Sequence, residues 1–167
     1  MLKLSTGLCA PSYIMAIDPG STESAYICLD TRTRKILSFG KIGNAQMLNK
    51  VQLTTARDVV CEEIRSYGMA VGATVFATCR YVGRIEQVCA NRAKPFHLVG
   101  RIDVKKSLAP LPRRNDKDVR DALISLYGEP GNAKSPGKTY GITKDVWAAF
   151  GVAHAYLQNP NAFPPVI

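Results

Sequence analysis

The sequence has no CxxC pair, and its five cysteines are an odd number without metal-ligand spacing. A zinc site is therefore not expected, and unpaired cysteines are typical of a reducing compartment. No apolar stretch approaches the roughly 20 residues that a membrane-spanning helix needs. Residues 1–12 lack the apolar core and cleavage site of a signal peptide. These absences predict a cytoplasmic protein without a membrane segment.

Acidic residues are few. The chain has 13 Asp and Glu against 22 Lys and Arg, which gives a formal net charge of +9. A small basic domain most often binds a polyanion, and nucleic acid is the commonest one. The alternative is a basic protein whose charge serves solubility alone.

Nothing in the sequence divides the chain. Its 167 residues contain neither an internal repeat nor a linker-like segment, and they are enough for one hydrophobic core. We therefore expect a single domain over residues 1–167. Within it, residues 1–12 are predicted to form a flexible N-terminal arm and residues 158–167 a C-terminal tail.

The order of apolar patterns predicts the class of fold. Three apolar runs separated by turns, at residues 13–17, 25–29 and 36–42, predict an antiparallel meander. Two later short strands are predicted within residues 58–68 and 94–100. Helical spacing spans residues 71–93, and three further helices are predicted, capped by Asn44, by Asn115 or Asp116, and by Thr143. Strands followed by alternating helices and strands indicate an α/β protein with a mixed sheet.

Acidic residues occur where predicted elements begin or end. Asp18 follows the first strand in a tight "DPG" turn, Glu62 and Glu63 end a later strand, and Asp145 lies in the first turn of the last helix. Successive strand residues point to opposite faces, so at most one of the two glutamates can join Asp18.

Convergence of such carboxylates would have a chemical consequence. Their mutual repulsion would raise their pKa values unless a divalent cation lay between them. Oxygen ligands alone favour Mg²⁺ or Mn²⁺, which is the chemistry of phosphodiester cleavage. An aspartate before Pro-Gly can equally serve only the turn, and the sequence leaves that alternative open.

Four segments, in order, resemble the motifs of RuvC-type Holliday junction resolvases. Their residues are most similar to those of the bacteriophage members. The segments are "AIDPGSTESAY", "VVCEEIRSYGM", "RRNDKDVRDAL" and "GITKDVWAAFGVAHA", which span about residues 13 to 156. The resemblance implies an RNase H-like mixed sheet, with three antiparallel strands followed by parallel strands and with helices on both faces.

The resemblance also implies a site. Asp18, Glu62 and Asp145 would be the catalytic metal ligands, and Lys117 would lie near the scissile phosphate. The chain departs from the family at Ala148, where an acid or a histidine is usual three positions after the helix acid. Asp116 is a possible extra acid, or it only caps its helix.

The implied activity is that of a Mg²⁺-dependent endodeoxyribonuclease, with Mn²⁺ as a substitute. A homodimer would nick two opposing strands of a four-way DNA junction, and no membrane partner is expected. The predicted dimer face lies on the helix after Val71 and includes Phe76, Cys79, Arg80, Gly83 and Ile85. Two alternatives remain: a catalytically weak or silent junction-binding protein of this fold, and an actin-like phosphate-binding ATPase-type domain.

A basic excess surrounds the proposed acids. The predicted DNA-binding residues are Arg65, Tyr67, Arg101, Lys105, Lys106, Arg113, Arg114, Lys117, Arg120, Lys134 and Lys138. The cations would hold phosphates near the metal ligands, and Tyr67 would stack on an unpaired base. A charged segment of this kind can also be only a solvated face.

Overall fold

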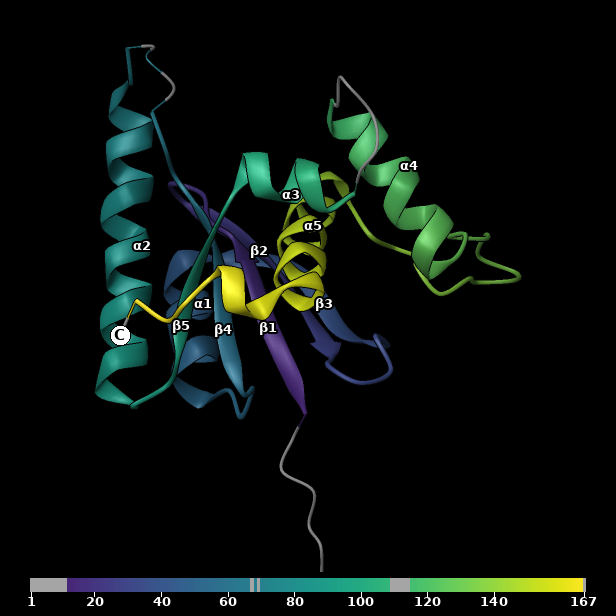
Figure 1. Cartoon of the computed structure of the whole chain (residues 1–167), viewed down its shortest axis with the longest axis horizontal. Coiled ribbons are helices and arrows are strands. Elements are labelled where there is room, and N and C mark those ends of the chain that lie inside the picture. The colour runs from purple at the N-terminus through teal and green to yellow at the C-terminus, as the bar shows by residue number, and fades with distance from the viewer. Residues whose placement is uncertain (1–11, 67, 69, 109–114, 167) are drawn as a thin grey trace, which may run out of the picture.

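The computed structural model describes residues 12–66, 68, 70–108 and 115–166. A five-stranded sheet of order β3-β2-β1-β4-β5 lies at its centre (Figure 1). The strands are β1 (Tyr13–Asp18), β2 (Glu23–Asp30), β3 (Ile36–Gly43), β4 (Asp58–Glu63) and β5 (Phe96–Gly100). The first three pair antiparallel, whereas β4 is parallel to β1 and β5 to β4. The predicted mixed sheet is confirmed.

Five α-helices and one 3₁₀ turn complete the described chain. They are α1 (Asn44–Leu53), α2 (Ala73–Asn91), α3 (Arg101–Ser107), α4 (Asp116–Tyr127), α5 (Lys144–Gln158) and η1 (Pro160–Ala162). Helix α3 was not expected from the sequence, because seven residues are too few to establish a helical period.

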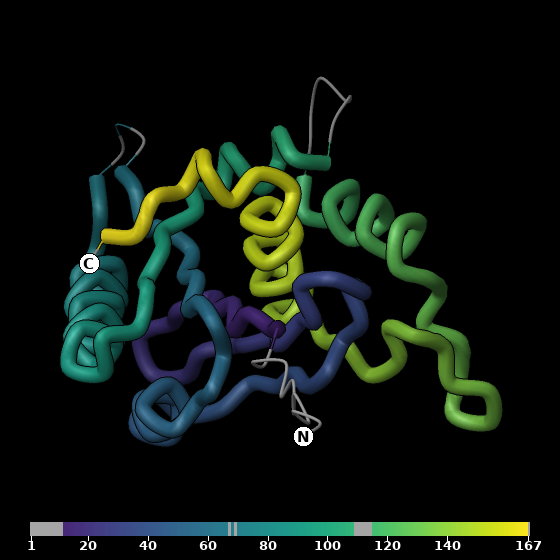
Figure 2. Tube along the Cα trace, turned by 60° about the horizontal axis from the view of Figure 1, so that its bottom comes forward, coloured from purple at the N-terminus to yellow at the C-terminus, as the bar shows by residue number. Residues whose placement is uncertain are grey.

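Helices cover both faces of the sheet, as predicted (Figures 1 and 2). Side chains of β1 alternate between the two layers. Ile14 and Ala16 belong to the core that contains α5, whereas Met15 and Ile17 belong to the core that contains α1 and α2. The parity of a strand residue therefore decides which layer it faces.

Helix α5 is the most buried helix of the described chain. Every residue from Val146 to Leu157 is buried except Ala148. A helix that is apolar nearly all round is typical of a protein interior. Gly151 lets α3 approach closely, because a Cβ atom there would lie 2.7 Å from Cγ1 of Val104.

The segment expected to be a C-terminal tail packs on the body of the protein. After η1, Phe163 packs against the core that contains α5. The Val166 amide donates a hydrogen bond of 2.8 Å to the Phe96 carbonyl, at the start of β5. The part of this segment that the structure describes, up to residue 166, is thus attached to the sheet.

Two helix starts distinguish a correct prediction from a wrong one. Asn115 caps α4 as expected, and a reciprocal bond between the Asp118 side chain and the Asn115 amide completes a capping box. Asn44, in contrast, is the first residue of α1 and not its cap, which is Gly43. No helix of the described residues is both long and apolar enough to cross a bilayer.

Candidate active site

The turn between β1 and β2 is held by side chains from outside it. The amide group of Asn44 donates to the Gly20 carbonyl at 2.9 Å and accepts from the Ser24 hydroxyl at 2.7 Å. That hydroxyl also accepts from the Gly20 amide at 3.2 Å. A Cβ atom at Gly20 would lie 2.2 Å from the Glu23 carbonyl oxygen, so this close turn requires glycine. The side chain of Asp18 takes no part in these bonds, so the turn does not depend on its carboxylate.

Asp18 and Glu62 share the face of the sheet that α5 covers. Asp18 lies two residues after Ala16, and Glu62 lies two residues after Val60; both apolar residues belong to the core that contains α5. The two acids follow the paired residues Ile17 and Cys61 of adjacent parallel strands. Strand alternation and register therefore bring two distant carboxylates together at the carboxyl ends of β1 and β4.

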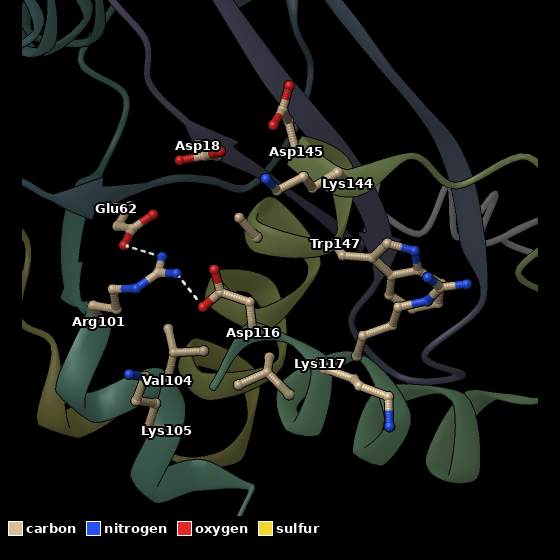
Figure 3. Close-up of a pocket in the computed structure, with 13 residues that line it drawn as sticks. Asp18, Glu62, Arg101, Val104, Lys105, Asp116, Lys117, Lys144, Asp145 and Trp147 are labelled. Atoms are coloured by element: carbon tan, nitrogen blue, oxygen red, sulfur yellow. Dashed lines mark hydrogen bonds and ion pairs between the residues drawn. The ribbon is translucent and has the colours of Figure 1, made fainter. Parts of the chain in front are cut away.

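A cavity of about 340 Å³ opens at this point between the sheet, α3, α4 and α5. Asp145 enters it from the first turn of α5, and Asp116 from the first turn of α4 (Figure 3). Its walls also include Ala148, Trp147 and five cations; these are Arg101, Lys105, Lys117, Arg120 and Lys144. We call this cavity the acidic pocket.

Asp18 is the electrostatic centre of the acidic pocket. Burial raises the pKa of its carboxyl to about 8, and the neighbouring carboxylates of Glu62 and Asp145 add to the effect. Arg101 acts in the opposite direction and is too weak to offset them. A buried carboxyl surrounded by other carboxylates lacks a compensating positive charge.

The other acids already have cationic partners. The Arg101 guanidinium bonds both Glu62, at 3.2 Å, and Asp116 (Figure 3). On the opposite side, the Lys41 ammonium lies 2.9 Å from Asp145 Oδ2 and 3.3 Å from Glu23 Oε2. Two protein cations thus hold the carboxylates that flank Asp18.

The donor set fits a divalent cation. Within the described ranges, no three His, Cys, Asp or Glu side chains are arranged so that they could hold a metal ion. Glu62 and Asp145 are instead turned to their cationic partners. The acids available are all carboxylates, which suit Mg²⁺ or Mn²⁺. The raised pKa of Asp18 indicates where positive charge would be most stabilising. Asp18, Glu62 and Asp145 are the residues that would hold such an ion.

Lys41 was missed in the sequence, although a signal for it exists. In the register of the antiparallel strands, Asp18 lies opposite Ala25, and Ala25 lies opposite Lys41. Directly paired residues point to the same face of a sheet. Once the meander is aligned, Lys41 is therefore expected on the same face as Asp18.

The predicted DNA-binding residues divide into groups. Arg101, Lys105, Lys117 and Arg120 line the acidic pocket; the Lys117 ammonium lies 3.4 Å from Asp121, and Arg120 lies over the Trp147 ring. Arg65 pairs with Glu63, and Lys106 is exposed on α3. Lys134 and Lys138 belong to the loop after α4, away from the pocket walls. The remaining predicted residues, Tyr67, Arg113 and Arg114, lie outside the described residues.

The mixed sheet of order β3-β2-β1-β4-β5 with helices on both faces defines an α/β fold (Figure 1). No family model and no curated protein matches the sequence. Two solved structures of Thermus thermophilus RuvC match the fold. One is in complex with a Holliday junction substrate: it has a TM-score of 0.71 and 14% identity, covering 93% of this chain and 99% of that chain. The other has a TM-score of 0.69 and 15% identity, covering 92% and 99%. The chain thus has the fold of RuvC over nearly its whole length.

Proposed function

We propose that this protein is a divalent-metal-dependent endonuclease that cuts four-way DNA junctions. The observation that carries the proposal is the acidic pocket, where carboxylates from β1, β4 and α5 meet in a RuvC-type fold. The similar Thermus thermophilus protein is in complex with a Holliday junction substrate, which supports branched DNA as the substrate class.

The residues of the pocket have separable roles in this proposal. Asp18, Glu62 and Asp145 hold the ion, Mg²⁺ in the first place with Mn²⁺ as a substitute. When bound, that ion supplies Lewis-acid stabilisation of the phosphodiester and activates water. Lys117 and Lys105, on the opposite wall, attract the backbone phosphates toward the carboxylates. Asp116 holds Arg101 and is not needed as a ligand.

Cleavage of a synthetic four-way junction tests the activity directly. We expect paired nicks in opposing strands with Mg²⁺ or Mn²⁺, and none in EDTA. Tight junction binding without nicking in either metal would overturn the nuclease and leave a silent binding protein, for which Ala148 in the pocket wall is the supporting feature. ATP turnover without junction binding would overturn both.

We further propose that two copies associate through the outer face of α2. Phe76 is 55% exposed there, and Val71 and Cys79 are also exposed. Ile85, which was expected on this face, is instead fully buried against the sheet, because it lies on the side of α2 that packs in the core with α1. Two sites related by a two-fold axis suit a two-fold substrate.

The dimer has its own test. Sedimentation of the wild type should give a dimer, and Phe76→Asp should shift it toward the monomer. Thr74→Asp is the matched control, because it adds the same charge at an exposed position of the same helix. Residues two positions apart in an α-helix are separated by about 200° around its axis, so Thr74 lies away from the Phe76 face. A monomeric wild type at micromolar concentration, or an equal shift in both variants, would overturn this dimer.

A further inference from the structure

A second cavity, of about 580 Å³, lies at the other end of α5 from the acidic pocket. The β2–β3 turn, the carboxyl ends of α4 and α5, and the loop after α4 surround it. Its lining residues are Thr33, Arg34, Lys35, Ile36, Leu126, Tyr127, Lys138, His154 and Gln158. Three of these are cations and none is a carboxylate. We call it the basic cavity.

Arg34 is fixed in place on both sides of its side chain. Its backbone has φ of 60°, a left-handed conformation that is uncommon outside glycine. The turn holds it there, because the Arg34 amide donates to the Asp30 carbonyl at 3.0 Å and the Asp30 carboxylate accepts from Thr33. At the far end, Nη2 donates to the Leu157 carbonyl at 2.7 Å. The guanidinium is therefore preorganised at the wall of the cavity.

One nitrogen of this guanidinium has an unmet requirement. Nη1 of Arg34 is buried and has no hydrogen-bond partner among the residues that the structure describes. A buried donor on a charged group is costly when it is unpaired. This atom is closed to solvent, so a shift of the side chain toward an acceptor in the cavity would be favourable. The positive charge of the group favours an anion over a neutral ligand.

The two lysines of the basic cavity differ from Arg101 and Lys117 of the acidic pocket. Lys35 and Lys138 are exposed, and neither forms an ion pair with another described residue. Arg101 and Lys117 are each bonded to at least one carboxylate. The positive charge around the basic cavity is thus not neutralised locally.

Neutral hydrogen-bonding groups complete the lining. The Tyr127 hydroxyl lies 3.1 Å from Nδ1 of His154. Burial and the adjacent Arg34 charge lower the pKa of His154 to about 4, so the ring is neutral at pH 7. Gln158 and Thr33 also line the cavity, and the Thr33 hydroxyl is bonded to Asp30, so the cations Arg34, Lys35 and Lys138 are the groups left to bind an anion.

We propose that the basic cavity is a phosphate-binding site, separate from the acidic pocket. In the junction-bound protein the phosphate is one of the DNA backbone, which rests on the proposed function. His154 follows Asp145 by nine residues on α5, which corresponds to about 14 Å at 1.5 Å per residue. That span is about four base pairs along a duplex. The cavity would therefore hold a DNA arm a few base pairs away from the cut.

The first experiment measures inorganic phosphate alone, at constant ionic strength and without DNA. We expect saturable binding by wild type, seen as chemical-shift changes at the Arg34 and His154 side chains. The double variant Lys35→Ala/Lys138→Ala should bind at least tenfold more weakly. Both lysines are exposed, so the variant is expected to fold. Absence of saturable binding in wild type, or equal binding in the variant, overturns the site.

The second experiment identifies the source of the phosphate. Junction binding is measured in EDTA over a series of salt concentrations. The slope of log K against log salt should fall by about one in the double variant, because both lysines serve the same phosphate. Arg32→Ala is the matched control, since Arg32 carries the same charge in the same turn but does not line the cavity.

The outcomes separate this site from the proposed function. A changed slope confined to the double variant supports a DNA phosphate. An unchanged slope with intact phosphate binding supports a free phosphate as the ligand. An equal change in Arg32→Ala indicates diffuse charge and overturns the DNA site. Wild-type protein that fails to bind junctions would contradict the proposed function, whereas the phosphate titration would still test the cavity.

Discussion

The two ends of α5 differ in how the protein handles charge. At its first turn, Asp145 shares the acidic pocket with Asp18 and Glu62, and the nearby cations Lys41 and Arg101 are engaged with carboxylates. At its last turns, cations surround the basic cavity without a carboxylate in its walls. The first end lacks positive charge at its centre, and the second lacks negative charge.

This difference indicates two kinds of ligand on one rigid element. The acidic pocket has oxygen donors and one carboxyl whose pKa is raised by burial and by neighbouring carboxylates. The basic cavity is lined by hydrogen-bond donors, and one buried guanidinium nitrogen of Arg34 lacks an acceptor. A polyanion bound together with a divalent cation would satisfy both ends at once.

Removal of one carboxylate is the strongest way to break the acidic side. Asp18→Asn or Glu62→Gln should lower the rate of junction nicking about a thousandfold or more, equivalent to about 4 kcal/mol of lost transition-state stabilisation. Single-turnover cleavage with Mg²⁺ measures the rate. Junction binding in EDTA should be unchanged, because neither residue is proposed to contact a phosphate.

The control for this prediction lies close to the same pocket. Asp121→Asn removes an exposed carboxylate that pairs only with Lys117 among the described residues, and it should keep most of the activity. If Asp18→Asn cleaves as fast as wild type, or loses junction binding, its assignment as a ligand is wrong.

The acidic side should lose stability as pH rises. The folded-state pKa of Asp18 is raised from 3.8 to about 8. Its contribution is therefore fully present below about pH 4 and is lost as pH rises through about 8. In EDTA, wild type should lose a few kcal/mol of unfolding free energy relative to Asp18→Asn between pH 5 and pH 8, measured by urea denaturation. Mg²⁺ should restore stability to wild type and not to the variant. Parallel pH curves in EDTA would contradict the electrostatic account of the pocket.

Lys41 tests the role of ion pairs at the acidic pocket. It lies outside the four sequence motifs and forms an ion pair with Asp145. Lys41→Ala should slow nicking roughly ten- to hundredfold by releasing the carboxylate from its position. The effect on stability should be small, because solvent screens an exposed ion pair. Glu23→Gln is the matched control: it removes the other partner of Lys41 and leaves the bond to Asp145. Equal losses in both variants would contradict a specific role for the bond between Lys41 and Asp145.

The basic side should respond to pH in the opposite direction. The pKa of His154 is lowered from 6.5 to about 4 by burial and by the charge of Arg34. The unfolded chain therefore takes up the proton first, and stability is lost as pH falls from 6.5 toward 4. Between pH 7 and pH 5, wild type should lose about 2 kcal/mol more than His154→Gln, measured by urea denaturation. An identical loss in the variant would assign the effect to other groups.

Much of the sheet could be predicted because its signals are local. Apolar runs and turns mark all five strands, and alternation already separates Glu62 from Glu63. The structure agrees on this point: Glu62 is buried in the acidic pocket, while Glu63 pairs with Arg65 away from its walls. The motif resemblance to RuvC also anticipated the fold over nearly its whole length.

The remaining features depend on contacts between distant segments. Lys41 enters the site only through the register of three strands. Asn44 looks like a helix cap, but its side chain is used by the β1–β2 turn, and no local pattern reveals that competition. Arg101 was predicted to contact DNA, whereas its bonds to Glu62 and Asp116 depend on how α3 packs.

That packing depends on a glycine, which has no side chain. Gly151 of α5 faces Val104 of α3, three residues after Arg101, and even a methyl group there would push the helices apart. A change from glycine to alanine, remote from any charged atom, would therefore move the guanidinium that steadies Glu62. The distance between these two helices therefore affects the position of the charged groups at their ends. A buried glycine far from those groups is thus a position at which the site could be altered by engineering.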